Sequence, residues 1–204
     1  MTQEAIQDII RRQREFFYTG ATLNIDFRIE ALKKLQASIQ AHQEQIDAAL
    51  KADLGKSSFE SYMCESGLVL SEITYLLKHI RSLSREKTVH TPLAQFHSRS
   101  FQKPSPYGVS LIMSPWNYPF LLTLDPLADA LAAGNTAVLK PSAYSPATGA
   151  VLCEIIRECF PEHHVAVVMG GRAENACLLQ EHFDYIFFTG SQSVGKEVMR
   201  KASE

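Results

Sequence analysis

Two short apolar runs on either side of a helical segment constrain this chain more than any other feature. Residues 109–113 and 136–139 are short and mostly apolar, a pattern that favours strands buried on both faces. Residues 121–133 between them are apolar around most of the helix circumference, and Gly134 is placed to end that helix. This order predicts a β–α–β unit whose two strands are parallel and finish at the same edge of a sheet.

The alternation of strand and helix continues along the rest of the chain. Apolar runs at 165–169 and 185–188 predict two more strands. Helices are expected between and after the strands, at 146–160, at 173–181 and from Ser191 or Ser193 through 201. The expected fold class is therefore α/β, with a parallel doubly wound (Rossmann-like) sheet over residues 107–204.

The residues before this sheet have a helical pattern. Apolar residues recur at helical spacing over 3–19, over 26–54 and from Ser57 or Ser58 onward. The third helix has an apolar stripe that we expect to be its buried face, formed by Tyr62, Val69, Ile73, Leu76, Leu77 and Ile80. Residues 1–85 are thus expected to form a helical layer packed on the sheet domain.

Residues 86–106 differ in character from both neighbours. They are extended in pattern and interrupted by proline, and residues 96–103 are predicted to form a strand or hairpin arm outside the main sheet. This arm separates the helical layer from the sheet domain.

Charge, hydropathy and cysteine spacing exclude several classes of protein. A net charge of −2 gives no electrostatic basis for binding nucleic acid. Asp125 and Asp129 interrupt the most apolar stretch, which argues against a membrane span, and the start of the chain has no secretory signal pattern. The four cysteines lack C-x-x-C spacing, which indicates buried reduced thiols in a cytoplasmic protein. No pattern of His, Cys or Asp has metal-ligand spacing, so no metal site is predicted.

Polar residues follow the first two predicted strands. Trp116 and Asn117 come just after the first strand and Pro115, and Lys140 stands at the end of the second. Sheets of this class bind ligands beyond the carboxyl ends of their strands. From residue type alone, Asn117 is most simply a turn former or helix cap, and Lys140 a solvated lysine.

A glycine-containing turn follows the last predicted strand. Residues 190–196 fit the first seven positions of a phosphate-binding loop, but Glu197 stands where the loop needs a Ser or Thr for magnesium. A strand-to-helix turn still presents free N–H groups and the positive end of a helix dipole. The turn therefore suits a pyrophosphate better than ATP with magnesium.

Three segments carry a resemblance to a known family. They read Ser-Pro-Trp-Asn-Tyr-Pro-Phe at 114–120, Ala-Ala-Gly-Asn-Thr-Ala-Val-Leu-Lys-Pro-Ser at 132–142 and Phe-Phe-Thr-Gly-Ser at 187–191. In these segments the chain closely resembles the aldehyde dehydrogenase family, in particular its shorter, class 3-like branch. The resemblance implies oxidation of a small-molecule aldehyde to a carboxylic acid with NAD or NADP, and a homo-oligomer whose oligomerisation element is the arm at 86–106.

The resemblance also implies roles for individual residues. Asn117 matches the position whose side-chain amide stabilises the oxyanion of the reaction. The cofactor contacts carried over are Met113, Ser114, Pro115, Trp116, Lys140, Gly190, Ser191, Val194 and Gly195. The sequence departs from many members at Ala143, where a glutamate would accept hydrogen bonds from the ribose hydroxyls. Since that carboxylate would repel a 2′-phosphate, its loss makes the use of NADP more favourable.

The family's nucleophilic cysteine and general-base glutamate correspond to positions beyond Glu204. The resemblance thus describes residues 107–204 as a partial NAD(P)-binding domain with the catalytic domain absent, and the chain alone is predicted to be inactive. We also expect an exposed sheet edge, with self-association, exchange of elements between chains or loss of order over 193–204. Two alternatives stay open: a non-catalytic nucleotide-binding or subunit-interaction module, and a reductase of the same superfamily that acts on an acyl phosphate or acyl-CoA.

Overall fold

A parallel four-stranded sheet forms the centre of the computed structural model, which describes residues 1–203. Its strands are β3 (Val109–Met113), β4 (Thr136–Lys140), β5 (Val165–Val167) and β6 (Tyr185–Phe188), in the order β5-β4-β3-β6. Leu111 of β3 lies opposite Val138 on one side and Ile186 on the other. The prediction of an α/β fold with a parallel sheet is confirmed.

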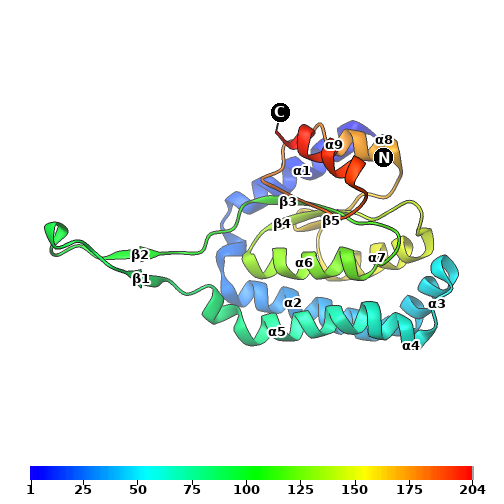
Figure 1. Cartoon of the computed structure of the whole chain (residues 1–204), viewed down its shortest axis with the longest axis horizontal. Coiled ribbons are helices and arrows are strands. Elements are labelled where there is room, and N and C mark those ends of the chain that lie inside the picture. The colour runs from blue at the N-terminus through cyan, green and yellow to red at the C-terminus, as the bar shows by residue number, and fades with distance from the viewer. Residues whose placement is uncertain (204) are drawn as a thin grey trace.

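Helices cover both faces of this sheet (Figure 1). On one face lie α6 (Leu121–Ala133) and α7 (Pro146–Cys159), and on the other α1 (Gln3–Tyr18), α8 (Arg172–Leu178) and α9 (Gln192–Ala202). Successive side chains of a strand point to opposite faces, so Ile112 joins the first core and Leu111 the second. The sheet is therefore doubly wound.

The amino-terminal helices divide between the two faces instead of forming one layer. Helix α1 packs beside β3 and β4, whereas α2 (Ile25–Ala41), α3 (Gln43–Leu54) and α5 (Gly67–Leu83) form the outer layer over α6 and α7. A short helix, α4 (Ser58–Ser61), and a π-helical turn at Tyr62–Ser66 lead into α5.

Two details of the helical prediction are wrong. The single helix expected over 26–54 is broken at His42, whose backbone leaves the helical region at φ −98° and ψ 14°. Tyr62, expected on a buried face, is exposed because the π-helical turn rotates it away from the stripe that continues in α5. Val69, Ile73, Leu76 and Ile80 are buried as expected, and Leu77 is partly buried.

The predicted ends of several elements are confirmed. Gly134 caps α6 with φ +93°, a conformation that favours glycine, and Gly55 caps α3 with φ +72°. Pro146 occupies the first turn of α7, and the Ser191 side chain caps α9. Local sequence signals thus set where these helices start and stop.

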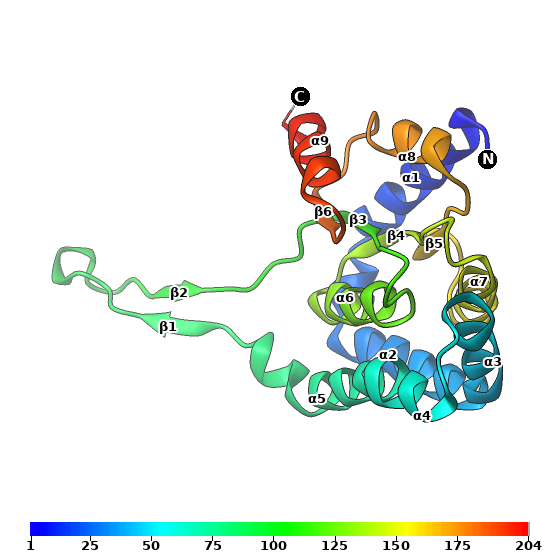
Figure 2. The same cartoon turned by 45° about the vertical axis from the view of Figure 1, so that its right-hand side comes forward.

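An antiparallel hairpin extends away from the rest of the molecule (Figures 1 and 2). Its strands are β1 (Lys87–Val89) and β2 (Ser100–Gln102), and Thr88 lies opposite Phe101. The expected arm outside the main sheet is present, and its tip exposes Leu93 and Phe96. Among the described residues, no helix combines the length and apolar character needed to cross a membrane.

Candidate functional site

A cavity of about 400 Å³ opens at the carboxyl edge of the sheet. Met113 and Ser114 at the end of β3, Lys140 at the end of β4 and Val194 of α9 all line it. The strand ends meet here because parallel strands in register finish at one edge. Four of the residues carried over from the family resemblance are thus brought to one cavity.

Lys140 forms part of the cavity wall and is buried, not solvated as its residue type suggested. The whole residue is only 3% exposed, and its Nζ donates to the carbonyl oxygens of Pro141 at 2.8 Å and Gly170 at 2.7 Å. Burial lowers the pKa of Lys140, and the nearby Glu174 carboxylate opposes that shift. Two of its three N–H donors are engaged, so the ammonium is held in one place, and the third has no partner among the described residues.

The loop after β3 is tied down by hydroxyl groups. The Ser114 backbone N–H donates to the Lys140 carbonyl at 3.3 Å, which extends the β3–β4 pairing by one residue. The Ser114 and Thr123 hydroxyls lie 2.6 Å apart, and the Thr123 hydroxyl donates to the Pro119 carbonyl at 2.6 Å. The start of α6 and the end of β3 are therefore fixed relative to each other.

Asn117 lies on this loop, and its position depends on a buried ion pair. The Lys56 Nζ donates to the Asn117 carbonyl at 3.0 Å and pairs with the Glu65 Oε1 at 2.5 Å. The other carboxylate oxygen of Glu65 accepts from the backbone N–H groups of Phe120 at 2.8 Å and Leu121 at 3.1 Å. The pair therefore anchors both ends of the segment that carries Asn117, while the Asn117 residue itself is exposed.

Lys56 and Glu65 were missed by the sequence reasoning. Glu65 is fully buried, and it lies one turn before Val69 on the apolar stripe of the third predicted helix. An acidic residue on a buried stripe needs a partner, which is the signal that could have found it. Nothing in its local sequence identifies Lys56, whose Nζ also lies 4.1 Å from the centre of the Tyr118 ring.

The turn before α9 packs tightly around Phe188. A Cβ on Gly190 would lie 2.5 Å from the Phe188 Cζ, and one on Gly195 would lie 3.4 Å from its ring. Gly190 therefore tolerates no side chain without movement of Phe188, as expected for a close approach. Ser191 Oγ accepts from the Val194 N–H at 3.4 Å, so one donor of the first turn is capped from within the chain.

The remaining expected site residues lie beside the cavity. Pro115, Trp116 and Asn117 follow β3, whereas Gly190, Ser191 and Gly195 flank Val194, and none of the six is in the cavity wall. Several residues that were not expected also line it, among them Arg172 and Asn175 of α8. The Asn175 Oδ1 is buried and lacks a hydrogen-bond partner among the described residues.

A larger hollow of about 630 Å³ lies next to β6, away from these residues. It is lined by 179–186 together with Lys201 and Ala202. None of the expected site residues borders it, so the smaller cavity is the better candidate for a cofactor site.

All four cysteines are free thiols. Burial raises the pKa of the Cys153 thiol and of the Cys159 thiol, which keeps both protonated. Cys64 and Cys177 are only partly buried, whereas the sequence predicted buried thiols. No cysteine borders the cavity among the residues described.

A model of the aldehyde dehydrogenase family matches residues 1–204. The chain is 44% identical over 191 residues to 4,4'-diaponeurosporen-aldehyde dehydrogenase of Staphylococcus aureus, covering 94% of this chain and 42% of that protein. It is 41% identical over 201 residues to aldehyde dehydrogenase family 3 member B1 of Homo sapiens, covering 98% of this chain and 43% of that protein. The chain therefore spans less than half the length of these relatives.

Solved structures agree with this match. The substrate-bound state of Staphylococcus aureus AldH superposes with a TM-score of 0.95 at 42% identity, over 97% of this chain and 43% of that one. Glyceraldehyde-3-phosphate dehydrogenase GapN of Methanocaldococcus jannaschii, in complex with NADP, superposes with a TM-score of 0.85 at 21% identity, over 99% of this chain and 44% of that one. The second likeness shows the fold alone.

Proposed function

This chain belongs to the aldehyde dehydrogenase family, and we propose that it is the amino-terminal, NAD(P)-binding portion of an enzyme that oxidises an aldehyde to a carboxylic acid. The observation that carries the proposal is the cavity at the carboxyl edge of the sheet, with the fixed ammonium of Lys140 in its wall. A bound nicotinamide cofactor would supply the hydride acceptor for the oxidation.

The residues around the cavity suit a dinucleotide. The remaining N–H of Lys140 can donate to a ribose hydroxyl, and the buried Oδ1 of Asn175 is an acceptor still in need of a donor. The turn at Gly190 and Ser191 leads into the positive end of α9, which favours a pyrophosphate. Met113, Ser114, Pro115, Trp116, Val194 and Gly195 complete the proposed contacts.

Asn117 is the proposed catalytic residue of this portion. Its amide N–H can donate to the oxyanion that forms when a thiolate adds to the aldehyde carbonyl, and an amide stays neutral beside a thiolate. Losing one such donor typically costs about 3 kcal/mol of transition-state stabilisation. The ion pair of Lys56 and Glu65 would act through Asn117, as a positioning device for its loop.

Cofactor binding tests this proposal directly on the 204-residue chain. The single tryptophan, Trp116, is 53% exposed on the loop beside the cavity. We expect NADH and NADPH to quench its fluorescence saturably. Lys140→Met should weaken both by about tenfold or more, through loss of a charge-assisted hydrogen bond. Circular dichroism checks that the variant is folded, and absence of saturable binding to the folded wild-type chain would overturn the proposal.

A second prediction concerns the choice of cofactor. Ala143 and Arg172 line the same cavity. Because residue 143 has no carboxylate, it would not repel the 2′-phosphate of NADPH. The guanidinium of Arg172 could pair with that phosphate. We expect the affinities for NADPH and NADH to lie within about tenfold of each other. Ala143→Glu should shift the preference toward NADH by roughly 1 kcal/mol or more, by hydrogen-bond and like-charge terms.

The neutral variant Ala143→Gln is the matched control for size. It should shift the preference less than Ala143→Glu, because it adds bulk without charge. If both variants leave the ratio of the two affinities unchanged, position 143 does not contact the ribose.

The third prediction is that the 204-residue chain oxidises no aldehyde on its own. Among the described residues no cysteine lines the cavity next to the Asn117 loop, and Cys153 and Cys159 are buried, protonated thiols. Absorbance at the wavelength of the reduced nicotinamide should stay flat with short and long aliphatic aldehydes. Steady formation of NADH or NADPH by purified chain would contradict the prediction.

The proposal also includes assembly into a homo-oligomer and a location in the cytoplasm. The hairpin of β1 and β2 projects with exposed apolar side chains at its tip, Leu93 and Phe96, which suits an oligomerisation element of a homo-oligomer. The four unpaired thiols fit the reducing environment of the cytoplasm.

A further inference from the structure

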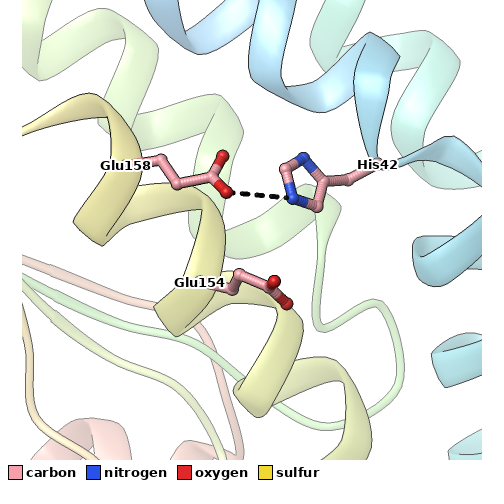
Figure 3. A group of neighbouring side chains, drawn as sticks. All are labelled: His42, Glu154 and Glu158. Atoms are coloured by element: carbon pink, nitrogen blue, oxygen red, sulfur yellow. Dashed lines mark ion pairs between the residues drawn. The ribbon is translucent and has the colours of Figure 1, made fainter.

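Three side chains able to bind a metal ion lie close together at the contact between α7 and the junction of α2 and α3, and none of them lines the cavity (Figure 3). They are His42, Glu154 and Glu158, and one ligand atom from each lies within 4.8 Å of the others. The two glutamates are one turn apart on α7, so both extend from the same side of that helix. His42 comes from the one-residue break between α2 and α3.

The break places His42 over α7, and the hydrogen bonds of its ring fix which nitrogen faces the glutamates. The Nδ1 lies 2.8 Å from the Ser38 carbonyl oxygen, which can only accept, so the Nδ1 carries the proton. The other ring nitrogen, the Nε2, is left facing the glutamates and lies 3.4 Å from the Glu158 Oε1. The His42 side chain is only 11% exposed, which limits its solvation by water.

The Glu158 carboxylate is oriented as well. The Ser38 hydroxyl donates to the Glu158 Oε2 at 3.2 Å, which leaves the Oε1 toward the imidazole. The Oε1 and the Nε2 then face each other across 3.4 Å, a separation that a shared metal ion can bridge.

We propose that His42, Glu154 and Glu158 form a Zn²⁺ site. One imidazole and two carboxylates are ligands that zinc accepts, and the two negative charges of the carboxylates balance the charge of Zn²⁺. With bonds of about 2.0–2.1 Å, neighbouring ligands on a tetrahedron lie roughly 3.3–3.4 Å apart, close to the observed separation of the Nε2 and the Oε1. The exposed Glu154 closes the site by a rotamer change, and a water molecule fills the fourth position.

The hydrogen bonds from Ser38 also match the surroundings of known zinc sites. A metal-binding histidine almost always donates its other ring N–H to a carbonyl or carboxylate, which orients the ring. Here the acceptor is the Ser38 carbonyl, one turn earlier in α2. The bound ion would link the junction of α2 and α3 to α7, and so join the outer helical layer to the helix beside the sheet.

Isothermal titration of tag-free 204-residue chain with ZnCl₂ tests the site. We expect one ion to bind per chain, and MgCl₂ to bind far more weakly because it prefers oxygen ligands alone. The double variant Glu154→Gln/Glu158→Gln should weaken zinc binding at least about tenfold, since loss of even an outer-shell partner costs about that much. Both glutamates are exposed, so these isosteric changes should leave the fold intact.

The matched control is Glu4→Gln/Glu60→Gln, which removes two exposed carboxylates elsewhere and should keep the wild-type affinity. A nitrogen-detected histidine spectrum should show the His42 Nε2 resonance move on addition of zinc while the Nδ1 stays protonated. If zinc does not bind, or binds equally to the Glu154→Gln/Glu158→Gln chain, the three side chains do not form a zinc site and the proposal is wrong.

Discussion

Replacing Glu65 with glutamine should lower the free energy of unfolding of this chain by about 3–5 kcal/mol, as is typical when one partner of a buried ion pair is removed. Glu65 is fully buried and Lys56 almost so, and the two side chains are 2.5 Å apart. Glutamine would leave the Lys56 ammonium without a counter-charge in a site that excludes water. Urea unfolding followed by circular dichroism measures the loss.

The same substitution should loosen the loop that carries Asn117. Glu65 accepts from the N–H groups of Phe120 and Leu121, and Lys56 holds the Asn117 carbonyl. Trp116 is the neighbour of Asn117, so its fluorescence anisotropy should fall when the anchor is lost. A structural role without connection to the loop would change the unfolding curve and leave the anisotropy of the folded chain unchanged.

Two controls separate the charge from the packing. Glu30→Gln breaks the exposed pair with Lys33 and should change stability little, because surface pairs are screened by water. Adding Lys56→Met to Glu65→Gln removes the unpaired ammonium and should recover a large part of the loss. If Glu65→Gln alone is as stable as the wild-type chain, the ion pair is not a stabilising anchor.

The second large effect is expected at low pH and comes from His164. The ring lies among Phe16, Phe27 and Phe160, is 4% exposed, and burial lowers its pKa from 6.5 to about 4, with His163 adding to the shift. The unfolded chain takes up a proton below pH 6.5 and the folded chain does not until about pH 4. The stability that depends on the neutral His164 ring is therefore fully present above the pKa of the unfolded chain, and it is lost as the pH falls from about 6.5 toward 4.

The magnitude follows from the shift in the pKa of His164. At roughly 1.4 kcal/mol per pH unit, the loss between neutral pH and pH 4.5 should be about 2.5 kcal/mol. His164→Phe keeps an apolar ring in place and should remove this part of the acid sensitivity, as read from unfolding curves at several pH values. The exposed His90 serves as control, and His90→Gln should follow the wild-type pH profile. Parallel profiles for the wild-type chain and His164→Phe would show that the ring is not held neutral.

Local patterns in the sequence predicted most of the elements. Strands at 109–113 and 185–188, the helix that ends at Gly134 and the proline at the start of α7 follow from side-chain period, glycine at a left-handed cap and the missing N–H of proline. These signals act within one or two turns of the chain. The parallel direction of the strands followed as well, because strands joined through helices run parallel in one sheet.

The candidate cavity was predicted only in part. Lys140 could be placed there because the ends of parallel strands meet at one edge of such a sheet, whereas Val194 came from the family resemblance. The burial of the Lys140 ammonium between two carbonyl groups could not be predicted, since one of them belongs to Gly170, in a loop that is distant in the sequence. Arg172 and Asn175 were missed for the same reason, as α8 reaches the cavity only through the packing of the domain.

The sequence by itself thus determined most of the elements, the class of the sheet and the edge at which we propose that a ligand binds. Only the tertiary structure decided that α1 crosses to the opposite face from α2, that the helix over 26–54 breaks at His42, and that Lys56 meets Glu65 beneath the Asn117 loop. Helix and strand are selected by the period of neighbouring side chains. Partners such as His42 and Glu158 are brought together by hydrophobic packing between α2, α3 and α7, which depends on the shapes of whole faces and leaves no local pattern to read.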